Sequence, residues 1–587
     1  MTAIAAPMSF STRFVLVLAA ALAVVLPGPS TQAETIYVCE TCSISSIQLA
    51  INASSDGDVI EVGAGTYYEY EINPGGRAII IRGELNKDGT PAVTIDAQWL
   101  GTVLYCDSGE TPSTRFENLV IVRGHAESDG GGMYNSNSSP TLENCTFEYN
   151  TGYDYGGGGM YNDNSSPTLT GCTFGNNGTA DSSGGGMHNT NESDPTLEDC
   201  TFQNNTASGD GGGMYNNNSS PTLENCTFTG NTAMSDGGGM FNQDDSEPTL
   251  TGCTFTGNIA GYNGDPASFG HGGGMYHGGG SLTLTDCTFS LNSVNNYGSG
   301  GGGMYNNSGS STLTNCTFEN NTAYYGPGGG MYNRGSLTLT NCTFENNTAN
   351  NYGGDGGGMY NSSSLTLVNC TFEYNTAAGG RGGGMYGDTN EPCTLENCTF
   401  TGNNANNAGG GMYDFGNQFS NPTLENCTFE NNIATYGGGM YIWSGSPTLT
   451  NCTFENNIAS SDDGDSDGGG MYNSSSSTPT LENCTFENNI ADDLGGGMYN
   501  NSSSPSFVPT LQDCLFCGNS TPQLVGYYVD AGGNAIMDEC HVDCPGDYDA
   551  SGYVDVGDLL LVISNWQNPY AVDDLLLVIS QWNSSCP

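Results

Sequence analysis

The apolar positions of this chain alternate with polar ones in runs of only three to five residues. Between residues 140 and 150, the apolar residues Leu142, Cys145 and Phe147 are separated by polar ones, and glycine, serine, proline and asparagine interrupt every such run. Period-two alternation in short runs of this kind predicts short β-strands joined by turns. No sustained 3.6-residue period occurs before the C-terminal region. The pattern therefore predicts an all-β chain.

The pattern recurs fourteen times. Each unit contains three glycines, a methionine, usually tyrosine and asparagine, and later the sequence Cys-Thr-Phe or a close variant. A period of this length indicates a solenoid, in which each unit buries its apolar face only by stacking on its neighbours. Three short strands and three bends in about 27 residues favour a parallel β-helix, because a β-propeller blade needs about 40–50 residues. The methionines are Met133, Met160, Met187, Met214, Met240, Met275, Met304, Met331, Met359, Met385, Met412, Met440, Met471 and Met498.

An asparagine follows the phenylalanine of every unit by three residues. Stacked turns place equivalent residues about 4.8 Å apart, so these asparagines should form one column. Asparagine tolerates left-handed backbone at a bend, and its amide can both donate and accept along a stack. We expect a structural ladder at one corner, formed by Asn150, Asn177, Asn205, Asn231, Asn258, Asn292, Asn321, Asn347, Asn375, Asn403, Asn432, Asn457, Asn489 and Asn519.

The chain contains 22 cysteines, and fourteen of them occupy one position of the repeat, from Cys145 to Cys514. Parallel neighbours in register have nearly parallel Cα–Cβ bonds, which suit a disulfide poorly. We expect this column to consist of buried free thiols that behave as small apolar side chains. Better candidates for disulfides are the remaining eight, Cys39, Cys42, Cys106, Cys393, Cys517, Cys540, Cys544 and Cys586.

The charge of the chain is strongly one-sided. With 62 acidic and 8 basic residues, its net charge is −54. Nucleic acids and anionic membranes are bound through basic patches, so neither is an expected partner. Between Met133 and Cys514 the basic side chains are Arg334 and Arg381. Ion pairs therefore cannot hold the repeats together.

The two ends differ from the repeats. Arg13 precedes a thirteen-residue apolar run, which is typical of a secretory signal and too short to span a membrane. Residues 45–53 predict a short amphipathic helix that covers the first turn. We expect a signal peptide in 1–33, an N-terminal cap and first turns in 34–128, the repetitive β-helix in 129–540 and a separate module in 541–587.

The N-terminal segment, with SIQLAINASSDGDVIEVGAGTYYE, AIIIRG and TIDA, resembles the entry of right-handed β-helix proteins of the pectate lyase and pectin methylesterase type. The repeats resemble those of bacterial surface proteins, including polymorphic outer-membrane proteins. The resemblance covers residues 35–520. It implies a right-handed parallel β-helix of about 14 regular rungs plus N-terminal capping rungs, in a secreted or cell-surface protein.

The C-terminal module carries acidic residues with the spacing of a calcium-binding loop, followed at once by the apolar helix-like run 559–566. It resembles a small α-helical dockerin type I domain, although its second loop is shortened to residues 570–574. The resemblance implies one Ca²⁺ and a cohesin-like docking partner. The expected ligands are Asp547, Asp549, Ser551, Tyr553 through its backbone carbonyl, Asp555 and Asp558.

Two functions remain open on the sequence. One is a non-catalytic rod with a structural or adhesive role, bound to a polysaccharide or a cell-envelope component. Its expected contact surface is the residue after each methionine, a tyrosine in twelve units, which should point outward if the methionine points inward. The alternative is a polysaccharide lyase or glycoside hydrolase. Its expected carboxylates recur in one column, at Glu143, Glu224, Glu396, Glu425 and Glu482, which more often marks a solvated face.

Overall fold

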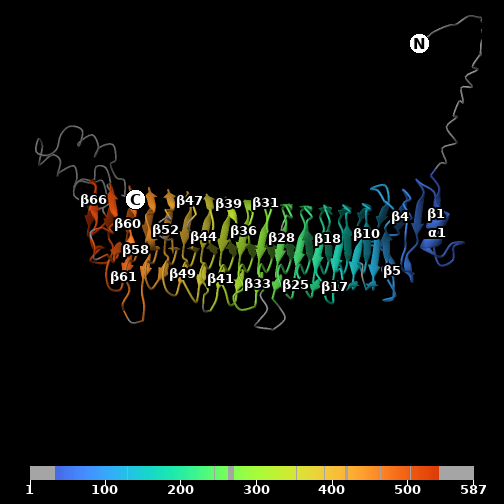
Figure 1. Cartoon of the computed structure of the whole chain (residues 1–587), viewed down its shortest axis with the longest axis horizontal. Helices are drawn as coiled ribbons and strands as arrows, with labels where there is room; N and C mark the ends of the chain where they lie inside the picture. The colour runs from blue at the N-terminus through green and yellow to red at the C-terminus, as the bar shows by residue number, and fades with distance from the viewer. Residues whose placement is uncertain are drawn as a thin grey trace, which may run out of the picture.

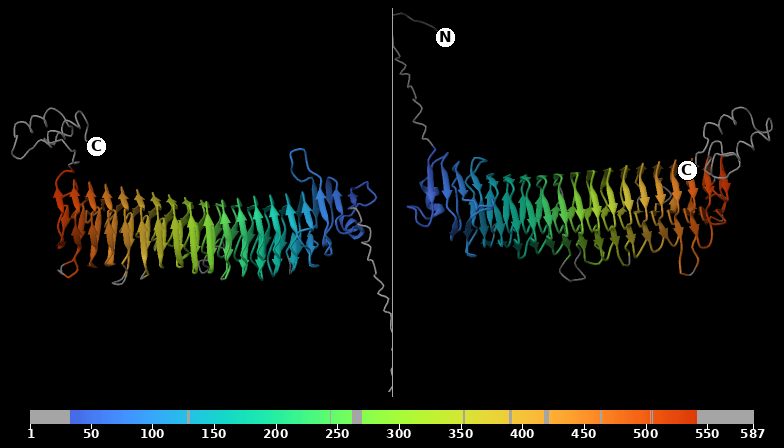
Figure 2. Two further views of the ribbon diagram at one scale, coloured as in Figure 1. Left: turned by 90° about the horizontal axis from the view of Figure 1, so that it is seen from above. Right: turned by 180° about the vertical axis from the view of Figure 1, so that it is seen from behind.

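The described residues form one elongated rod (Figure 1). Two further views show the same stacked strands along its whole length (Figure 2). The computed structural model describes residues 33–127, 130–243, 245–261, 270–351, 353–388, 391–416, 421–462, 464–502, 504 and 506–540.

Four strands make one regular turn, and each strand belongs to a different parallel sheet. We name the four sheets after a residue or feature that they share. The methionine sheet includes β6 (Leu104–Cys106), β10 (Met133–Ser136), β62 (Met498–Asn500) and β65 (Leu524–Val525), and the short-strand sheet includes β9 (His125–Ala126), β13 (Thr151–Gly152) and β61 (Ile490–Ala491). The leucine sheet includes β1 (Thr35–Val38), β2 (Val59–Val62), β4 (Ile80–Gly83), β7 (Arg115–Glu117), β11 (Thr141–Glu143), β63 (Thr510–Gln512) and β66 (Val529–Asp530). The phenylalanine sheet includes β3 (Gly65–Tyr67), β5 (Val93–Asp96), β8 (Leu119–Val122), β12 (Thr146–Glu148), β60 (Thr485–Glu487), β64 (Leu515–Cys517) and β67 (Ala535–Met537).

Successive turns pair in register, as the repeat requires. Met133 lies opposite Met160, Leu142 opposite Leu169, and Phe147 opposite Phe174. The all-β parallel solenoid is therefore confirmed. The prediction of three strands per turn was wrong. The fourth strand, which follows the ladder asparagine, has only two residues and is too short to show alternation in the sequence. The rod makes about 17 turns, more than the fourteen repeat units, because turns without the glycine–methionine pattern stack at both ends.

The core is built from columns of identical side chains. The methionine, leucine, cysteine and phenylalanine of each repeat point inward and are almost completely buried. Neighbouring phenylalanine rings lie parallel, with centroids 4.8 Å apart between Phe147 and Phe174 and 4.6 Å apart between Phe486 and Phe516. Among the described residues, no helix is long and apolar enough to cross a membrane.

The asparagine ladder is confirmed, with one correction. Nδ2 of Asn150 donates to Oδ1 of Asn177 at 3.0 Å, and Nδ2 of Asn177 donates to Oδ1 of Asn205 at 3.1 Å. Each amide is thus saturated along the stack, which a buried polar group requires. The left-handed residue is not the ladder asparagine but the residue before it, such as Tyr149 with φ 55° or Asn176 with φ 54°.

A second asparagine column lines the interior of the methionine sheet, at the second position after the methionine. Nδ2 of Asn135 donates to Oδ1 of Asn162, and Nδ2 of Asn162 donates to Oδ1 of Asn189, both at 2.8 Å. The sequence analysis did not assign this role to these residues. The sequence signal was of the same kind as for the first ladder: in most units an asparagine recurs at a fixed position, here two residues after the inward-pointing methionine. The column is interrupted by His277, Gly387, Asp414 and Ile442.

The glycines before each methionine allow the backbones of neighbouring turns to approach closely. A Cβ on Gly329 would lie only 2.4 Å from the carbonyl oxygen of Gly357 and 2.5 Å from the carbonyl carbon of Thr348. The glycine three residues before the methionine also has positive φ in every unit from Met160 to Met498, with 69° at Gly328. Any other residue would be strained or would clash at this corner.

The cysteine column consists of buried free thiols, as expected. Cys39 is bonded to Cys42, and Cys517 to Cys540. The expectation of a bridge was wrong for Cys106 and Cys393, which are free and buried in the core. Both side chains point into the core, where they pack as apolar side chains. They therefore do not meet another cysteine outside the column. Cys544 and Cys586 lie outside the described residues.

A short helix covers the N-terminal end of the rod, as the sequence predicted. Helix α1 (Ile47–Ala53) begins after Ser46, whose side chain accepts the Leu49 amide, and it buries Ile47, Ala50 and Ile51 against the first turn. The expected signal peptide falls almost entirely outside the described residues, and so does the module in 541–587. The predicted divisions of the chain therefore stay predictions.

Candidate glycan-binding surface

The residues that follow the methionines point outward, as expected, and form one column on the outer face of the methionine sheet. From Tyr276 to Tyr499 neighbouring rings are stacked, with centroids between 4.6 and 5.3 Å apart. Each ring face between Tyr276 and Tyr499 is covered by the next ring, so a sugar ring has no room to stack on it. Tyr386 is only 4% exposed and Tyr413 only 2%. The column offers ring edges and hydroxyl groups to solvent.

Burial in the column changes the acidity of the phenols. It raises the pKa of Tyr386, Tyr441 and Tyr472 well above the ordinary value of 10, and neighbouring charges add to the effect. Burial also raises the pKa of Tyr215 to about 12. These hydroxyl groups therefore stay protonated at neutral pH and can donate hydrogen bonds.

Arg381 lies against this column. Its guanidinium carbon is 5.2 Å from the centroid of Tyr413 and 5.8 Å from those of Tyr386 and Phe415. Nη1 donates to the hydroxyl of Tyr413 at 3.4 Å, and Nε is 3.8 Å from a carboxylate oxygen of Asp355. Although burial opposes its charge, Asp355 and Tyr413 raise the pKa of Arg381. The side chain is 34% exposed, so a permanent positive charge reaches the surface here.

Two large aromatic residues widen the surface beside Arg381. Phe415 follows strand β50 (Met412–Asp414), and Trp443 lies in strand β54 (Met440–Gly445) of the next turn. Their rings are stacked, 5.9 Å apart and inclined by 23°. Trp443 is 47% exposed, so much of this large residue is accessible to solvent. A shift of register between Ile442 and Ser444 accompanies this strand, where it pairs with β58 (Met471–Ser477).

Arg334, the other arginine of the repetitive part, lies on the same outer face of the methionine sheet as Arg381. Nη1 of Arg334 donates to the hydroxyl of Tyr305 at 3.4 Å, and this contact raises the pKa of Arg334. The chain has a net charge of −54, and Arg334 and Arg381 are the two arginines between Met133 and Cys514. The outer face of the methionine sheet thus combines aromatic rings with both of these positive charges. Arg381, Phe415 and Trp443 form what we call the aromatic–arginine patch.

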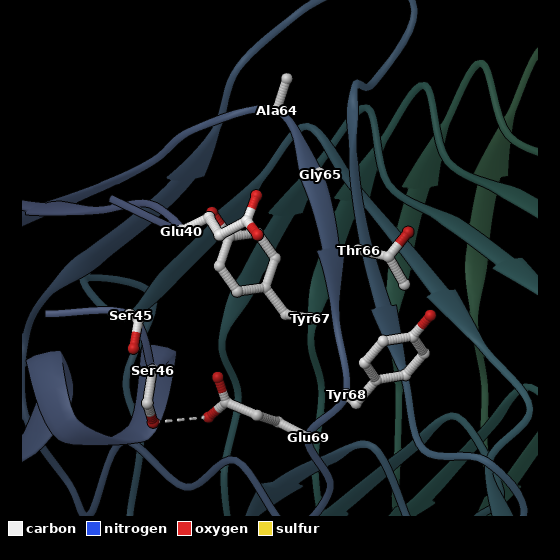
Figure 3. Close-up of a pocket in the computed structure, with 9 residues that line it drawn as sticks. All are labelled: Glu40, Ser45, Ser46, Ala64, Gly65, Thr66, Tyr67, Tyr68 and Glu69. Carbon is white, nitrogen blue, oxygen red and sulfur yellow. Dashed lines mark hydrogen bonds between the residues drawn. The ribbon is translucent and has the colours of Figure 1, made fainter. Parts of the chain in front are cut away.

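A cavity of about 550 Å³ lies at the N-terminal end of the rod (Figure 3). Tyr67 and Tyr68, which follow one another at the end of β3, line it together with Glu40 and Glu69. Glu69 is already engaged, because it accepts from the Ser46 hydroxyl at 2.9 Å and from the amides at the start of α1. Tyr67 donates to the Gly63 carbonyl at 2.8 Å. These contacts fix the helix on the first turn.

A second cavity, of about 430 Å³, is lined by His125, Glu127, Tyr153 and Asp154. These residues lie at and beyond the ends of β9 and β13, on neighbouring turns of the short-strand sheet. The rings of His125 and Tyr153 meet edge to face at 5.0 Å. The sequence analysis did not single out these residues, because Tyr153 and Asp154 lie 28 and 29 residues after His125 and no repeat consensus marks them.

Comparison with known proteins identifies the family. The model of the right-handed β-helix region matches residues 93–255, 215–381 and 358–543. The chain belongs to this family. No curated protein matches the β-helix significantly.

Among solved structures, the β-helix is similar to the pectate lyase Pel9A, with 16% identity over 58% of this chain and 77% of the other, at a TM-score of 0.23. It is similar to the A-module of the Azotobacter vinelandii mannuronan C-5 epimerase AlgE6, with 13% identity, coverage of 84% and 96%, and a TM-score of 0.24. It is also similar to the PL6 alginate lyase AlyGC, with 10% identity, coverage of 86% and 99%, and a TM-score of 0.20. At these TM-scores, no property of the three enzymes is transferred to this chain.

Arg82 and Arg115, near the N-terminal end of the β-helix, are engaged in ion pairs. Arg82 contacts Glu61 at 3.1 Å and Glu117 at 2.6 Å, and Arg115 contacts Glu117 at 2.8 Å and Glu143 at 2.9 Å. The same carboxylates hold the guanidinium groups in place on the outer face of the leucine sheet.

The glutamate column lies on the exposed face of the leucine sheet. Glu224, Glu396, Glu425 and Glu482 are exposed, and in each strand a buried leucine separates the glutamate from an exposed threonine. Glu143 is paired with Arg115. Their arrangement is that of a solvated face rather than of two carboxylates on either side of a bound sugar.

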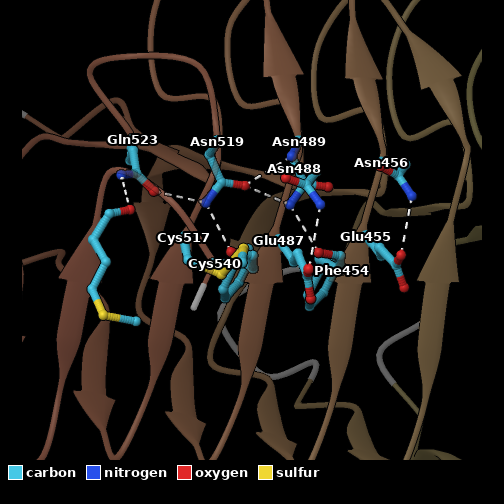
Figure 4. The surroundings of a disulfide bond; sticks show 12 residues. Phe454, Glu455, Asn456, Glu487, Asn488, Asn489, Cys517, Asn519, Gln523 and Cys540 are labelled. Carbon is cyan, nitrogen blue, oxygen red and sulfur yellow. Dashed lines mark hydrogen bonds between the residues drawn. A yellow bond between two sulfur atoms is a disulfide. The ribbon is translucent and has the colours of Figure 1, made fainter. Parts of the chain in front are cut away.

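The six predicted calcium ligands, from Asp547 to Asp558, lie outside the described residues. Within the described part, Glu487 lies next to the sulfur atoms of Cys517 and Cys540 (Figure 4). These two sulfur atoms are bonded to each other, and a disulfide offers no thiolate to a metal. This group therefore closes the C-terminal end of the β-helix rather than forming a metal site.

Proposed function

We propose that this β-helix is an exported, non-catalytic rod that binds a polysaccharide or another glycan of the cell envelope. The observation that carries the proposal is the aromatic–arginine patch on the methionine sheet. Exposed aromatic rings pack on the apolar faces of sugar rings, and tyrosine and arginine donate hydrogen bonds to sugar oxygens. Trp443 supplies an exposed aromatic ring, and Arg381 supplies donors beside it.

The repeat itself favours an extended ligand. One turn rises about 4.8 Å, which is close to the length of one pyranose residue. A glycan that runs along the rod would therefore meet the tyrosine hydroxyl groups at intervals similar to its own. The net negative charge of the chain repels polyanions, so the proposed ligand is not a strongly acidic polymer.

The proposal includes the C-terminal module. We infer that Asp547, Asp549, Ser551, Asp555 and Asp558, with the Tyr553 carbonyl, hold one Ca²⁺, which is the cation that oxygen ligands at this spacing favour. A module of this kind would attach the rod to a cohesin-like partner outside the cell. Calcium titration of the full chain by calorimetry tests this part, and the D549N/D555N double variant should abolish the binding heat.

The patch is tested by binding to immobilised envelope polysaccharides and to a glycan array. Trp443→Ala and Arg381→Gln should each weaken binding at least tenfold. Tyr374→Asn is the matched control, because it removes an exposed ring from the phenylalanine sheet and places there the asparagine that other turns carry. Equal binding by all three variants and the unmodified chain would falsify the proposal.

Cleavage of a polysaccharide is the second candidate, and the cavity at His125 favours it. Glu127 and Asp154 provide carboxylates, and His125 and Tyr153 provide groups able to transfer a proton. Release of reducing ends or of unsaturated products by the full chain, lost in Glu127→Gln, would support this function over simple binding. Persistence of that activity in the variant would remove the cavity from consideration.

A further inference from the structure

The C-terminal end of the β-helix exposes side chains that are buried in every earlier turn. Ile536 of β67 lies in register with Phe516 of β64, at the inward position of the phenylalanine column. Phe516 is fully buried, whereas Ile536 is 51% exposed. Leu524 of β65 continues the methionine column and is only partly buried. Tyr527 and Tyr528, between β65 and β66, are also exposed.

The backbone at this end is open as well. In the described part of the chain, β65, β66 and β67 pair with the preceding turn and not with a following one. Unpaired strand edges beside apolar side chains favour aggregation unless something covers them. We call this region, formed by Leu524, the two tyrosines and Ile536, the terminal surface.

The opposite end shows how this chain covers such a surface. Helix α1 lies over the first turn and buries Ile47, Ala50 and Ile51 against it. The covering element there is a short apolar helix contributed by the chain itself. Nothing equivalent precedes Cys540 at the C-terminal end in the described residues.

The disulfide fixes where the remaining chain begins. Cys540 is bonded to Cys517, at the end of β64, so the described part of the chain ends beside the last turns (Figure 4). The 47 residues from 541 to 587 follow. They contain two apolar runs, Leu559–Ile563 and Leu575–Ile579, each long enough for more than one helical turn.

We propose that the segment 541–587 folds back and covers the terminal surface with these apolar runs, as α1 covers the other end. A second copy of the chain is a poorer occupant, because each copy carries a net charge of −54 and β65 and β66 offer only two residues each for pairing. The calcium loop precedes the first apolar run and remains free to bind its ion in this arrangement.

Hydrogen–deuterium exchange of the full-length chain tests the proposal. In the unmodified chain, peptides from residues 524–537 should be protected, and the double variant Leu560→Asp/Leu576→Asp should speed their exchange at least tenfold. Asn565→Asp/Gln581→Glu is the control, because it adds the same two charges to polar positions of the same segment. Peptides from the central turns should be unaffected in all chains, which establishes that the variants are folded.

A reciprocal variant covers the case in which the double substitution disrupts its own segment. Ile536→Asp should make residues 541–587 at least tenfold more sensitive to limited proteolysis without changing the central turns. The proposal is overturned if neither variant has its effect. It is also overturned if protection of 524–537 in the unmodified chain falls on dilution, because a second copy would then be the cover.

Discussion

Replacing Asp414 with asparagine should stabilise the rod at neutral and alkaline pH. Asp414 interrupts the interior asparagine column and is only 3% exposed. Its Oδ1 accepts the Gly416 amide at 3.1 Å, and its Oδ2 is buried without a hydrogen-bond partner. Burial raises the pKa of this carboxyl from 3.8 to about 7. Asn333 and Asn361 in the same column donate to the carbonyl two residues later, so asparagine at 414 would find an acceptor at Gly416.

The shift gives the size and the sign of the effect. A rise of about 3 pKa units corresponds to about 4 kcal/mol, at 1.36 kcal/mol per unit. Because the folded chain holds the proton more tightly than the unfolded chain, the ionised carboxyl costs stability above pH 7. That cost diminishes as the pH falls and is gone near the unfolded value of 3.8. Asp414→Asn should therefore stabilise by up to about 4 kcal/mol at pH 8 and by almost nothing at pH 4.

Hydrogen–deuterium exchange of β50 and thermal unfolding of the full chain, each at pH 4 and pH 8, measure the difference. Cys393 is the titratable neighbour, and burial followed by the charge of Asp414 raises its pKa, so it stays neutral throughout this range. Asp388→Asn, on the outer face of the neighbouring turn, is the control. A stabilisation by Asp414→Asn that is the same at both pH values would refute the reasoning.

Three further outcomes follow from the columns. Asn321→Leu removes the donor to Asn347 Oδ1 and to the Phe289 carbonyl, so urea unfolding should show a loss of about 3 kcal/mol or more, whereas Asn320→Asp at an exposed corner should change little. Gly329→Ala should lower the thermal midpoint by several degrees because its Cβ meets backbone at 2.4 Å, while Gly171→Asn, with open space and φ 61°, should not. A thiol reagent should leave the buried cysteines of the native chain unmodified and titrate them after denaturation in guanidinium, and rapid labelling of native Cys316 would contradict the packing.

The repeat was sufficient to predict the parallel β-helix, the thiol column and the ladder at Asn150, because a periodic sequence gives register directly. Features that occur once could not be found in this way. The patch at Arg381 depends on Phe415 and Trp443, which replace polar residues of neighbouring turns at one position. The stacking that covers the tyrosine faces follows from the 4.8 Å spacing, which is shorter than the gap a sugar ring needs between two aromatic planes. Cys106 and Cys393 were misassigned because they stand outside the repeat position but still point inward.

The thiol column has a consequence for biogenesis. Under the export that we propose, the chain meets oxidants while it is still unfolded, and its many cysteines could then form disulfides in almost any combination. In the finished rod each sulfur is shielded and lies beside parallel neighbours that cannot bond to it. The chain must therefore fold faster than its thiols are oxidised. Folding that adds one turn after another would bury each thiol as soon as its turn has formed. Slow assembly would leave a tangled, covalently crosslinked product.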